Sequence, residues 1–328
     1  MSPAPTVHRD RILVTGAAGF LGANVVIALA QKGISVVAAD RESPPPELLA
    51  SLTASAEQIE WTRLDVRRSE DWATLPANGI TAVIHAAAVT TGEDDPDPAL
   101  TCDVNTGGTV KALEWAAKHG IRRFVYVSSS AVYRGTVTDQ PLHEDLPLRP
   151  TTAYGRSKLA AEGFVELYGQ TRGLQTVIAR LPSLYGPWER PGEHRRNPSP
   201  VYQLVKAIKD SASPVCAAGA DVGRDWTYVG DAAAGLVHLA LLDEPPELVN
   251  LSWGRMVALR ELAEVLEQVS GVPVQLKEGP ACIRMTPTSG DQPMDVRALA
   301  AAGFVATTGP ADGLRSYWEW LSDPRRPA

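Results

Sequence analysis

A tyrosine and a lysine stand four positions apart in the stretch TTAYGRSKLAAE, as Tyr154 and Lys158. On a helix this spacing places both side chains on one face. A phenol titrates near about 10, and a neighbouring ammonium lowers that pKa by stabilising the phenolate. The same spacing also arises by chance on a solvated helix surface. The pattern alone therefore leaves two interpretations open, a tuned general acid–base pair and an ordinary amphipathic helix.

A glycine-rich turn follows the apolar run RILVTG at 11–16 and opens a segment with helical periodicity. Between a strand and a helix, such a turn lets backbone N–H groups approach a pyrophosphate, and the helix N-terminus favours its negative charge. Glycines needed only for close helix packing are the alternative. The sequence predicts a dinucleotide site with these contacts: Gly16, Gly19, Phe20, Leu21 and Gly22.

An acidic residue, Asp40, closes the next predicted strand at 34–40, near the distance of about 20 residues at which an acid meets an adenosine ribose. A carboxylate there accepts hydrogen bonds from the ribose hydroxyls and repels a 2′-phosphate. This favours NAD over NADP. Arg41, which could receive the phosphate, keeps NADP as the less favoured cofactor.

Apolar strands alternate with helices through the first half of the chain, which is typical of a parallel sheet with right-handed crossovers. From residue 182 the sequence becomes rich in proline, glycine and charge. We predict an α/β fold with a Rossmann-type doubly wound parallel sheet in an NAD-binding domain at 1–181, completed by segments near 225–252. A smaller, mixed substrate-binding domain is predicted at 182–328.

The composition excludes several classes of protein. The 328 residues carry a net charge of −7, which gives no electrostatic case for nucleic acid. Three cysteines without a CxxC pair argue against a disulfide scaffold and a zinc knuckle, and fit a reducing compartment. No metal site is predicted. Without a signal-like N-terminus or a membrane-length apolar run, the expected location is the cytoplasm.

Short motifs run through nearly the whole chain in the order of a known family. They are GxxGxxG, LDVR at 64–67, HAAA at 85–88, VSSSAVY at 127–133, YxxxK, LYGP at 184–187 and RDWTYVGD at 224–231. Together they resemble the extended short-chain dehydrogenase/reductases, also called the NAD-dependent epimerase/dehydratase family. The resemblance implies NAD as cofactor and hydride transfer to it from a sugar carbinol.

The resemblance also implies roles for three catalytic residues. Ser129 matches the family's catalytic serine or threonine, which hydrogen-bonds the substrate oxygen. Tyr154 matches the acid/base, and Lys158 matches the residue that lowers the pKa of that tyrosine and holds the nicotinamide ribose. With this match, the acid–base interpretation of the tyrosine and lysine becomes the favoured one.

Further cofactor contacts follow from the same resemblance. They are Asp65 and Val66 at the adenine, Ala86, Ala87 and Ala88 along the cofactor's path, and Asn105 near the active site. His85 is interpreted as a structural histidine, and Tyr133 and Tyr185 as wall and packing residues.

Substrate contacts are predicted at Thr90, Ser129, Ser130, Ser183, Arg190 and Arg224. Arg224 matches an arginine that clamps a nucleotide-sugar phosphate in the family, and a salt bridge to Asp225 or Asp231 is the alternative. Ser183 replaces the family's asparagine before YGP, which counts against a nucleotide sugar. Arg190 belongs to a basic loop at 188–196 that could close over an anion or stay solvated.

Three functions remain after these assignments. Ser130 and Ala131 stand where family dehydratases carry an acid pair, which argues against a 4,6-dehydratase. The leading hypothesis is a nucleotide-sugar 4-epimerase, and the alternative is an NAD-dependent dehydrogenase of a free sugar, sugar acid or polyol. A non-catalytic dinucleotide-binding protein is the third. The resemblance also implies a homodimer through the helix with YxxxK. An apolar stripe of Ala160, Ala161, Phe164 and Leu167 is compatible with that contact, and ordinary core packing is the alternative.

Overall fold

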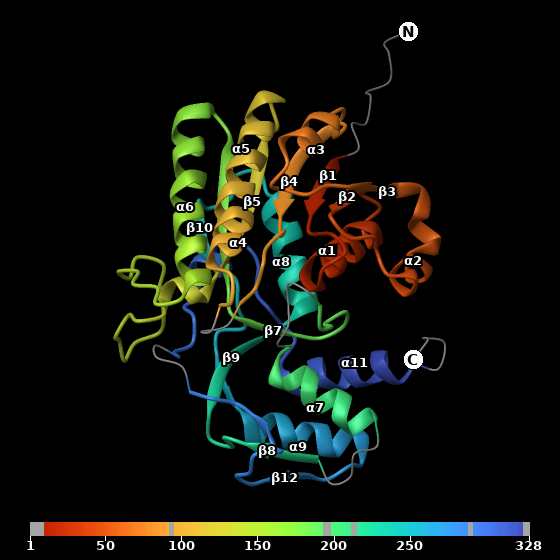
Figure 1. Cartoon of the computed structure of the whole chain (residues 1–328), viewed down its shortest axis with the longest axis vertical. Coiled ribbons are helices and arrows are strands. Elements are labelled where there is room, and N and C mark those ends of the chain that lie inside the picture. Colours follow the sequence, from red (N-terminus) through yellow and green to blue (C-terminus); the bar gives the residue numbers. More distant parts are fainter. Residues whose placement is uncertain (1–9, 92–94, 193–197, 211–214, 288–290, 324–328) are drawn as a thin grey trace.

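The computed structural model describes residues 10–91, 95–192, 198–210, 215–287 and 291–323. Figure 1 shows a larger part at the top, built on one sheet, and a smaller part below it. The large sheet has seven parallel strands in the order β10-β6-β5-β4-β1-β2-β3. Its strands are β1 (Arg11–Thr15), β2 (Ser35–Asp40), β3 (Ile59–Arg63), β4 (Ile80–His85), β5 (Arg123–Ser129), β6 (Gln175–Leu181) and β10 (Leu248–Asn250).

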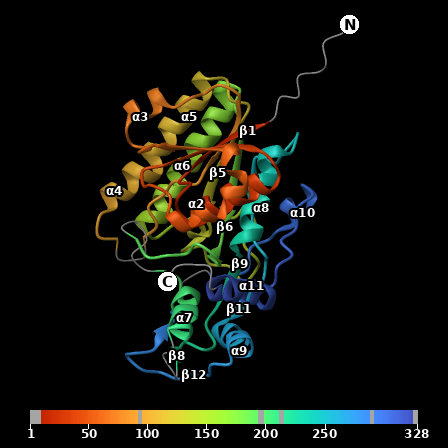
Figure 2. The ribbon, with the colours of Figure 1, turned by 90° about the vertical axis from the view of Figure 1, so that its right-hand side faces the viewer.

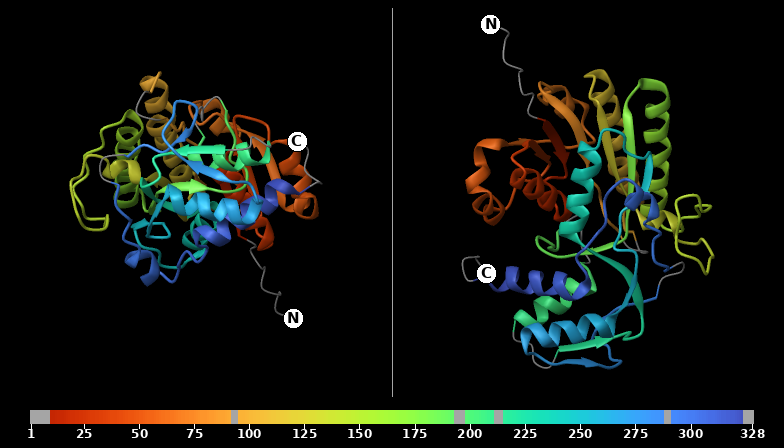
Figure 3. Two further views of the ribbon diagram at one scale, coloured as in Figure 1. Left: turned by 90° about the horizontal axis from the view of Figure 1, so that it is seen from below. Right: turned by 180° about the vertical axis from the view of Figure 1, so that it is seen from behind.

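Helices cover both faces of this sheet, because its strands are apolar on both sides. In β1, Ile12 and Val14 pack with helices α1 (Phe20–Gln31) and α8 (Val229–Leu241) on one face. Leu13 points to the opposite face, where the core also contains residues of α3 (Ser69–Thr74), α5 (Gly108–Lys118) and α6 (Ala153–Arg172). Figure 3 (right) shows α8 in teal beside the red α1. The predicted Rossmann-type fold is confirmed.

The smaller part contains two three-stranded sheets and its own apolar core. One sheet consists of β7 (Ser183–Tyr185), β9 (Gly223–Tyr228) and β11 (Met256–Ala258), and the other of β8 (Val215–Ala218), β12 (Val274–Leu276) and β13 (Ile283–Arg284). Its helices are α7 (Pro200–Lys209), α9 (Leu259–Ser270) and α11 (Pro310–Ser322). Figure 2 shows α7 and α9 beside β8 and β12 below the large sheet.

Short elements complete the chain. They are the helices α2 (Pro46–Ser51), α4 (Pro98–Cys102) and α10 (Arg297–Ala301), the 3-10 turns Thr53–Gln58 and Ser130–Tyr133, and a π-helical turn at Asp103–Gly107. Although β10 and α8 follow the smaller part's first strands in sequence, they pack in the larger part. Within the described ranges, no helix is both long and apolar enough to cross a membrane.

The cysteines correct one sequence argument. Cys216 and Cys282 form a disulfide, whereas Cys102 is an exposed free thiol. The low number of cysteines argued against a scaffold built on disulfides and for a reducing compartment. The structure nevertheless has one disulfide. The two cysteines are 66 residues apart, and no short spacing motif marks them as a pair.

A buried ion pair ties α6 to the sheet. The guanidinium of Arg180 in β6 donates to both carboxylate oxygens of Glu162 in α6, at 3.0 and 2.7 Å. The two side chains are only 3% and 2% exposed. Arg180 also donates to the Tyr133 hydroxyl at 2.9 Å, and Ser128 donates to Glu162. This network fixes α6 against the strand ends that form the site below.

Replacing Arg180→Met is expected to lower the free energy of unfolding by about 3–5 kcal/mol, because it leaves the Glu162 carboxylate buried without its cation. Urea denaturation measures the change. The matched control is Arg260→Met, whose ion pair with Asp221 is 47% and 85% exposed and should contribute less than about 1 kcal/mol. Equal losses in the two variants would contradict the role given to the buried pair.

Candidate active site

A cleft of about 1060 Å³ runs from the glycine turn of the larger part to β9 and β13 of the smaller part. Its wall includes the carboxyl ends of β1, β2, β4 and β5. Ligands of open α/β sheets bind at this end of the strands. The cleft is therefore the place where the predicted residues must meet.

The glycine turn forms one end of the cleft, and its five predicted contacts, residues 16, 19, 20, 21 and 22, all lie in the wall. Gly16 has φ +70°, and a Cβ there would lie 2.7 Å from the nitrogen of Ala87. A Cβ on Gly22 would lie 1.9 Å from the Gly16 oxygen. The glycines are thus required for packing, and they also leave the N-terminus of α1 open to the cleft.

Asp40 lies beside this turn and is fixed in place by backbone donors. Its carboxylate accepts hydrogen bonds from the backbone N–H of Ala18 and of Glu42, both at 2.9 Å. Burial raises the pKa of Asp40 above its usual value, which those hydrogen bonds partly oppose. Arg41 also lines the cleft, and its guanidinium donates to Glu42 at 2.9 Å.

Asp65 and Val66 form the next section of the wall. The Asp65 carboxylate accepts from the Arg67 guanidinium at 2.9 and 2.6 Å, and these hydrogen bonds lower the pKa of Asp65 to about 2. The three small residues Ala86, Ala87 and Ala88 also line the cleft. This part of the wall therefore combines an ionised carboxylate with methyl groups that take up little space.

The middle of the cleft contains Ser129, Tyr154 and Lys158 together. Ser129 ends β5, and Tyr154 lies in the first turn of α6, whose N-cap Thr152 accepts a hydrogen bond from Gly155 N at 3.0 Å. A Cβ on Gly155 would lie 2.6 Å from the Ala131 oxygen, so this glycine allows α6 to approach the end of β5.

Lys158 is 2% exposed and lies with its Nζ 5.9 Å from the centre of the Tyr154 ring. It donates a hydrogen bond to Val127 O at 2.9 Å and lies 5.0 Å from the centre of the Tyr126 ring. Burial lowers the pKa of Lys158 to about 7, against the opposing effect of the Glu162 carboxylate. The spacing of Tyr154 and Lys158 therefore does bring phenol and amine to one face, in a site with little water.

His85 is structural, as the sequence interpretation has it. Its ring nitrogens lie 2.8 Å from Thr15 Oγ1 and 3.2 Å from Thr109 Oγ1. Burial, with a smaller effect of the Lys158 charge, lowers the pKa of His85 to about 3. The ring is therefore neutral and fixes β4 to its neighbours.

Asn105 lies behind the wall of the cleft. It is fully buried, accepts from Val89 N at 2.8 Å and donates to Val89 O and to Ser157 Oγ at 3.0 Å. It is absent from the described residues that line the cleft. The asparagine predicted to contact the cofactor thus positions the loop after β4 against α6, from a π-helical turn, an element frequent at functional sites.

The predicted substrate contacts all reach the cleft. Its wall includes Thr90, Ser129, Ser130, Ser183, Arg190 and Arg224. Arg190 donates to Ala18 O at 2.8 Å, which connects the segment after β7 to the glycine turn. Residues 193–197 of the predicted basic loop lie outside the described residues.

Arg224 points to the cleft and donates to the Thr286 carbonyl at 3.0 Å. The two acids proposed as alternative partners have other donors. Asp225 accepts from Ser252 at 2.6 Å and from Met294 N at 2.9 Å, and burial raises its pKa to about 6. Asp231 accepts from the hydroxyl and backbone N–H of Thr308.

Charge is unevenly distributed along the cleft. Among its described wall residues, the carboxylates Asp40, Glu42 and Asp65 all lie near the glycine turn and β3. Arginines are spread more widely. Arg41 and Arg67 lie at that same end, Arg190 donates to Ala18 O beside the glycine turn, and Arg134 follows the turn after β5. Arg224 and Arg284 line the half of the cleft that the smaller part forms. This half of the cleft suits a ligand with more than one negative charge, because guanidinium groups bind phosphate at two points.

Comparison with known sequences decides the family. The profile of the NAD dependent epimerase/dehydratase family matches residues 12–252. The chain belongs to this family. The match extends from β1 to just beyond β10, so it includes the whole large sheet and most of the cleft wall.

Relatives within the family are similar over nearly the whole chain. A putative UDP-glucose 4-epimerase of Methanocaldococcus jannaschii is 25% identical over 96% of this chain and 99% of its own. The UDP-glucose 4-epimerase of Azospirillum brasilense is 30% identical over 82% and 80%. The crystal structure of the Thermus thermophilus UDP-glucose 4-epimerase in complex with NAD is 25% identical, with a TM-score of 0.81 over 96% and 99% of the chains.

Two arginines of this family member were not predicted from its sequence. Arg134 directly follows the VSSSAVY motif, and its place beside that motif could have marked it as a wall residue. Arg284 lies in the two-residue strand β13, where no periodic pattern signals a strand. Only the pairing of β13 with β8 brings it to the cleft.

Lys158 gives a pH-dependent prediction. With its pKa near 7 in the folded protein and near 10.5 in the unfolded chain, the unfolded state binds more protons between these values. In protein freed of bound nucleotide, wild type should therefore gain stability relative to Lys158→Met as the pH rises from about 7 to 10, by up to about 1.4 kcal/mol per pH unit. Urea unfolding at several pH values measures this. If the free energies of unfolding of the two proteins changed in parallel with pH, the pKa of Lys158 would be the same in the folded and unfolded states.

Proposed function

We propose that this chain is an NAD-dependent nucleotide-sugar 4-epimerase that acts on a UDP-hexose. The observation that supports it most is one continuous cleft joining three features: a glycine turn at a helix N-terminus, the Ser129–Tyr154–Lys158 group, and an arginine-lined end. The named relatives with this activity match the chain from end to end.

The glycine turn, Asp40, Asp65 and the small residues after β4 would hold NAD. NAD bound there would supply a reversible acceptor for the hydride of the sugar C4. The fit rests on the channel's own chemistry: backbone N–H groups at the helix N-terminus suit a pyrophosphate. The Asp40 carboxylate suits ribose hydroxyls and disfavours a 2′-phosphate.

Tyr154 is the proposed acid/base. Its phenolate takes the proton of the C4 hydroxyl as that carbon is oxidised, and the phenol returns it when the carbon is reduced. Lys158, in its ammonium form, stabilises the phenolate from the same helix face. Ser129 donates a hydrogen bond to the same substrate oxygen. Arg190, Arg224 and Arg284 of the same cleft wall would hold the diphosphate.

We also propose a homodimer formed through the outer face of α6. Phe164 is 39% exposed and Leu167 47% exposed, and Ala160 lies on the same side. Ala161, the other residue of the predicted stripe, is fully buried in the core of its own chain. The remaining apolar side chains form a continuous exposed strip that a second copy would cover.

For the catalytic assignment, Tyr154→Phe should reduce interconversion of UDP-glucose and UDP-galactose by at least about 100-fold, since it removes the group that carries the proton. Bound NAD, measured by absorbance after denaturation, should remain. Tyr168→Phe on the same helix is the matched control and should retain activity. Near-normal turnover in the Tyr154 variant would contradict the assignment.

Two other results with the wild-type protein would favour the alternative functions. Steady NADH release from a free sugar acid would favour a dehydrogenase, and ligand binding without turnover would favour a non-catalytic role.

For the dimer, the double change Phe164→Glu and Leu167→Glu should give a monomer by light scattering, because two charges would be buried at the proposed contact. Val137→Glu, at a side chain that is 99% exposed, is the control and should leave the mass unchanged. A monomeric wild type at assay concentration would refute the proposed dimer.

A further inference from the structure

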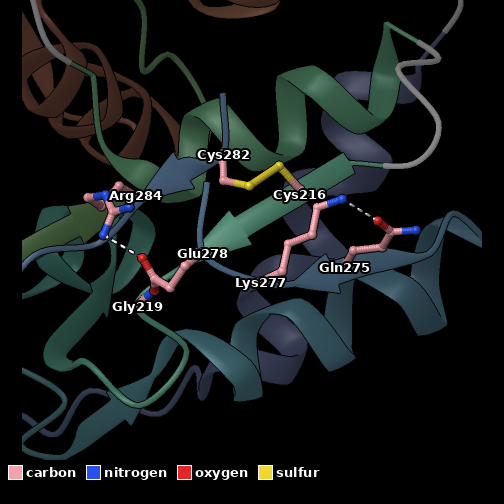
Figure 4. The surroundings of a disulfide bond; sticks show 7 residues. All are labelled: Cys216, Gly219, Gln275, Lys277, Glu278, Cys282 and Arg284. Atoms are coloured by element: carbon pink, nitrogen blue, oxygen red, sulfur yellow. Dashed lines mark hydrogen bonds and ion pairs between the residues drawn. A yellow bond between two sulfur atoms is a disulfide. The ribbon is translucent and has the colours of Figure 1, made fainter. Parts of the chain in front are cut away.

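The disulfide lies beneath the arginine-lined end of the cleft. Cys216 belongs to β8, the central strand of its sheet, and Cys282 directly precedes the edge strand β13 (Figure 4). Their Cα atoms are 4.8 Å apart. Both cysteines are partly exposed, so small thiols can reach the bond.

The segment 279–286 contains Cys282 and strand β13. Strand β13 pairs with β8 over two residues, Ile283 with Ala217 and Arg284 with Ala218. Buried Met285 donates its backbone N–H to Ala218 O at 3.0 Å. The Arg284–Glu278 ion pair, at 2.8 Å, is largely solvated and contributes little. The Met285 side chain also belongs to the apolar core of the smaller part, and Ile283 packs against that core. The disulfide adds a covalent restraint on this segment, at the residue before β13.

The same segment builds part of the cleft. Arg284 and Thr286 lie in the wall, and the Thr286 carbonyl accepts the hydrogen bond of Arg224 at 3.0 Å. Figure 4 shows Arg284 directed to Glu278, whose other carboxylate oxygen accepts from Gly219 N at 3.1 Å. Movement of the segment would thus displace one arginine of the cleft and remove a partner that orients another.

We propose that the Cys216–Cys282 disulfide is a redox-controlled positioning element for the anionic part of the substrate. In the oxidised protein it holds Arg284 and Thr286, and through Thr286 also Arg224, where a diphosphate is bound. In the reduced protein the segment is free to leave the wall, and affinity for the substrate falls. The inference rests on the proposed function, and it concerns the phosphate end of the cleft, away from Tyr154.

The chemical step is thiol–disulfide exchange with a dithiol reductant. One thiolate of the reductant attacks a sulfur of the pair and releases the other cysteine as a thiolate, which takes up a proton. The second thiol of the reductant then displaces the remaining cysteine and closes its own disulfide. The protein gains two electrons and two protons, and the reductant loses the same. A disulfide oxidant such as oxidised glutathione reverses the step.

The test uses full-length protein with Cys102→Ser, which removes the exposed thiol. After dithiothreitol treatment, UDP should bind at least about tenfold more weakly, as for a lost charge-assisted hydrogen bond. Calorimetry measures UDP binding, and mass spectrometry verifies the state of the cysteines. KM for UDP-glucose should rise by a similar factor, with kcat within about twofold and bound NAD unchanged. Oxidised glutathione should restore the original affinity.

Three variants distinguish an effect of the disulfide on the position of Arg284 from an effect on the stability of the whole protein. The double change Cys216→Ser and Cys282→Ser should bind UDP as weakly as the reduced protein. Dithiothreitol should not change its affinity. In Arg284→Gln, affinity should already be low, and reduction should have less effect than in its parent, because the two changes act on one group. The matched control is Arg260→Gln, an exposed arginine of the same part, outside the described cleft wall. It should keep the full redox response.

Equal UDP affinity and KM in the verified oxidised and reduced states would overturn the inference and leave the proposed function intact. Cysteines that stay unpaired after oxidant would also overturn it. So would a reduced protein that loses NAD and affinity together, since that indicates unfolding. Absence of UDP binding and epimerase activity in both states would instead overturn the proposed function, and the inference with it.

Discussion

The exclusion of water from Lys158 is the constraint on which the rest of the active site depends. A buried amine loses hydration, and its charged form persists only where the protein supplies compensating partners. Here these are the Val127 carbonyl, the face of the Tyr126 ring and, further off, the Glu162 carboxylate. All of them depend on α6 lying close against β5, which the buried pair of Glu162 with Arg180 maintains.

The two ends of the cleft offer different groups to a negatively charged ligand. At the glycine turn, backbone N–H groups and a helix N-terminus face the cleft, so a pyrophosphate needs no cationic side chain there, and Asp40 can lie beside it. At the other end, the charge comes from guanidinium groups such as Arg224 and Arg284, carried by the smaller part. The proposed cofactor contacts thus belong to the large sheet, whereas the arginines proposed for the substrate depend on how the smaller part is held.

The sequence predicted best those features that depend on a few neighbouring residues. The interval from Tyr154 to Lys158, the glycine turn and the acid at the end of β2 all depend on local periodicity, and the structure brings each to the cleft. The sequence placed Asn105 near the active site as a cofactor contact on the family resemblance. A motif does not say which groups a buried side chain contacts, and here Asn105 is hydrogen-bonded to the backbone of Val89 behind the cleft wall.

By itself, the sequence determined the family, the alternation of strands and helices, and the residues proposed for proton transfer, because these follow from short-range patterns of apolar residues, glycines and motifs. Only the tertiary structure decided that Arg284 reaches the cleft and that Cys216 pairs with Cys282. These pairings join distant segments through a two-residue edge strand, which is too short for any periodicity to specify its register.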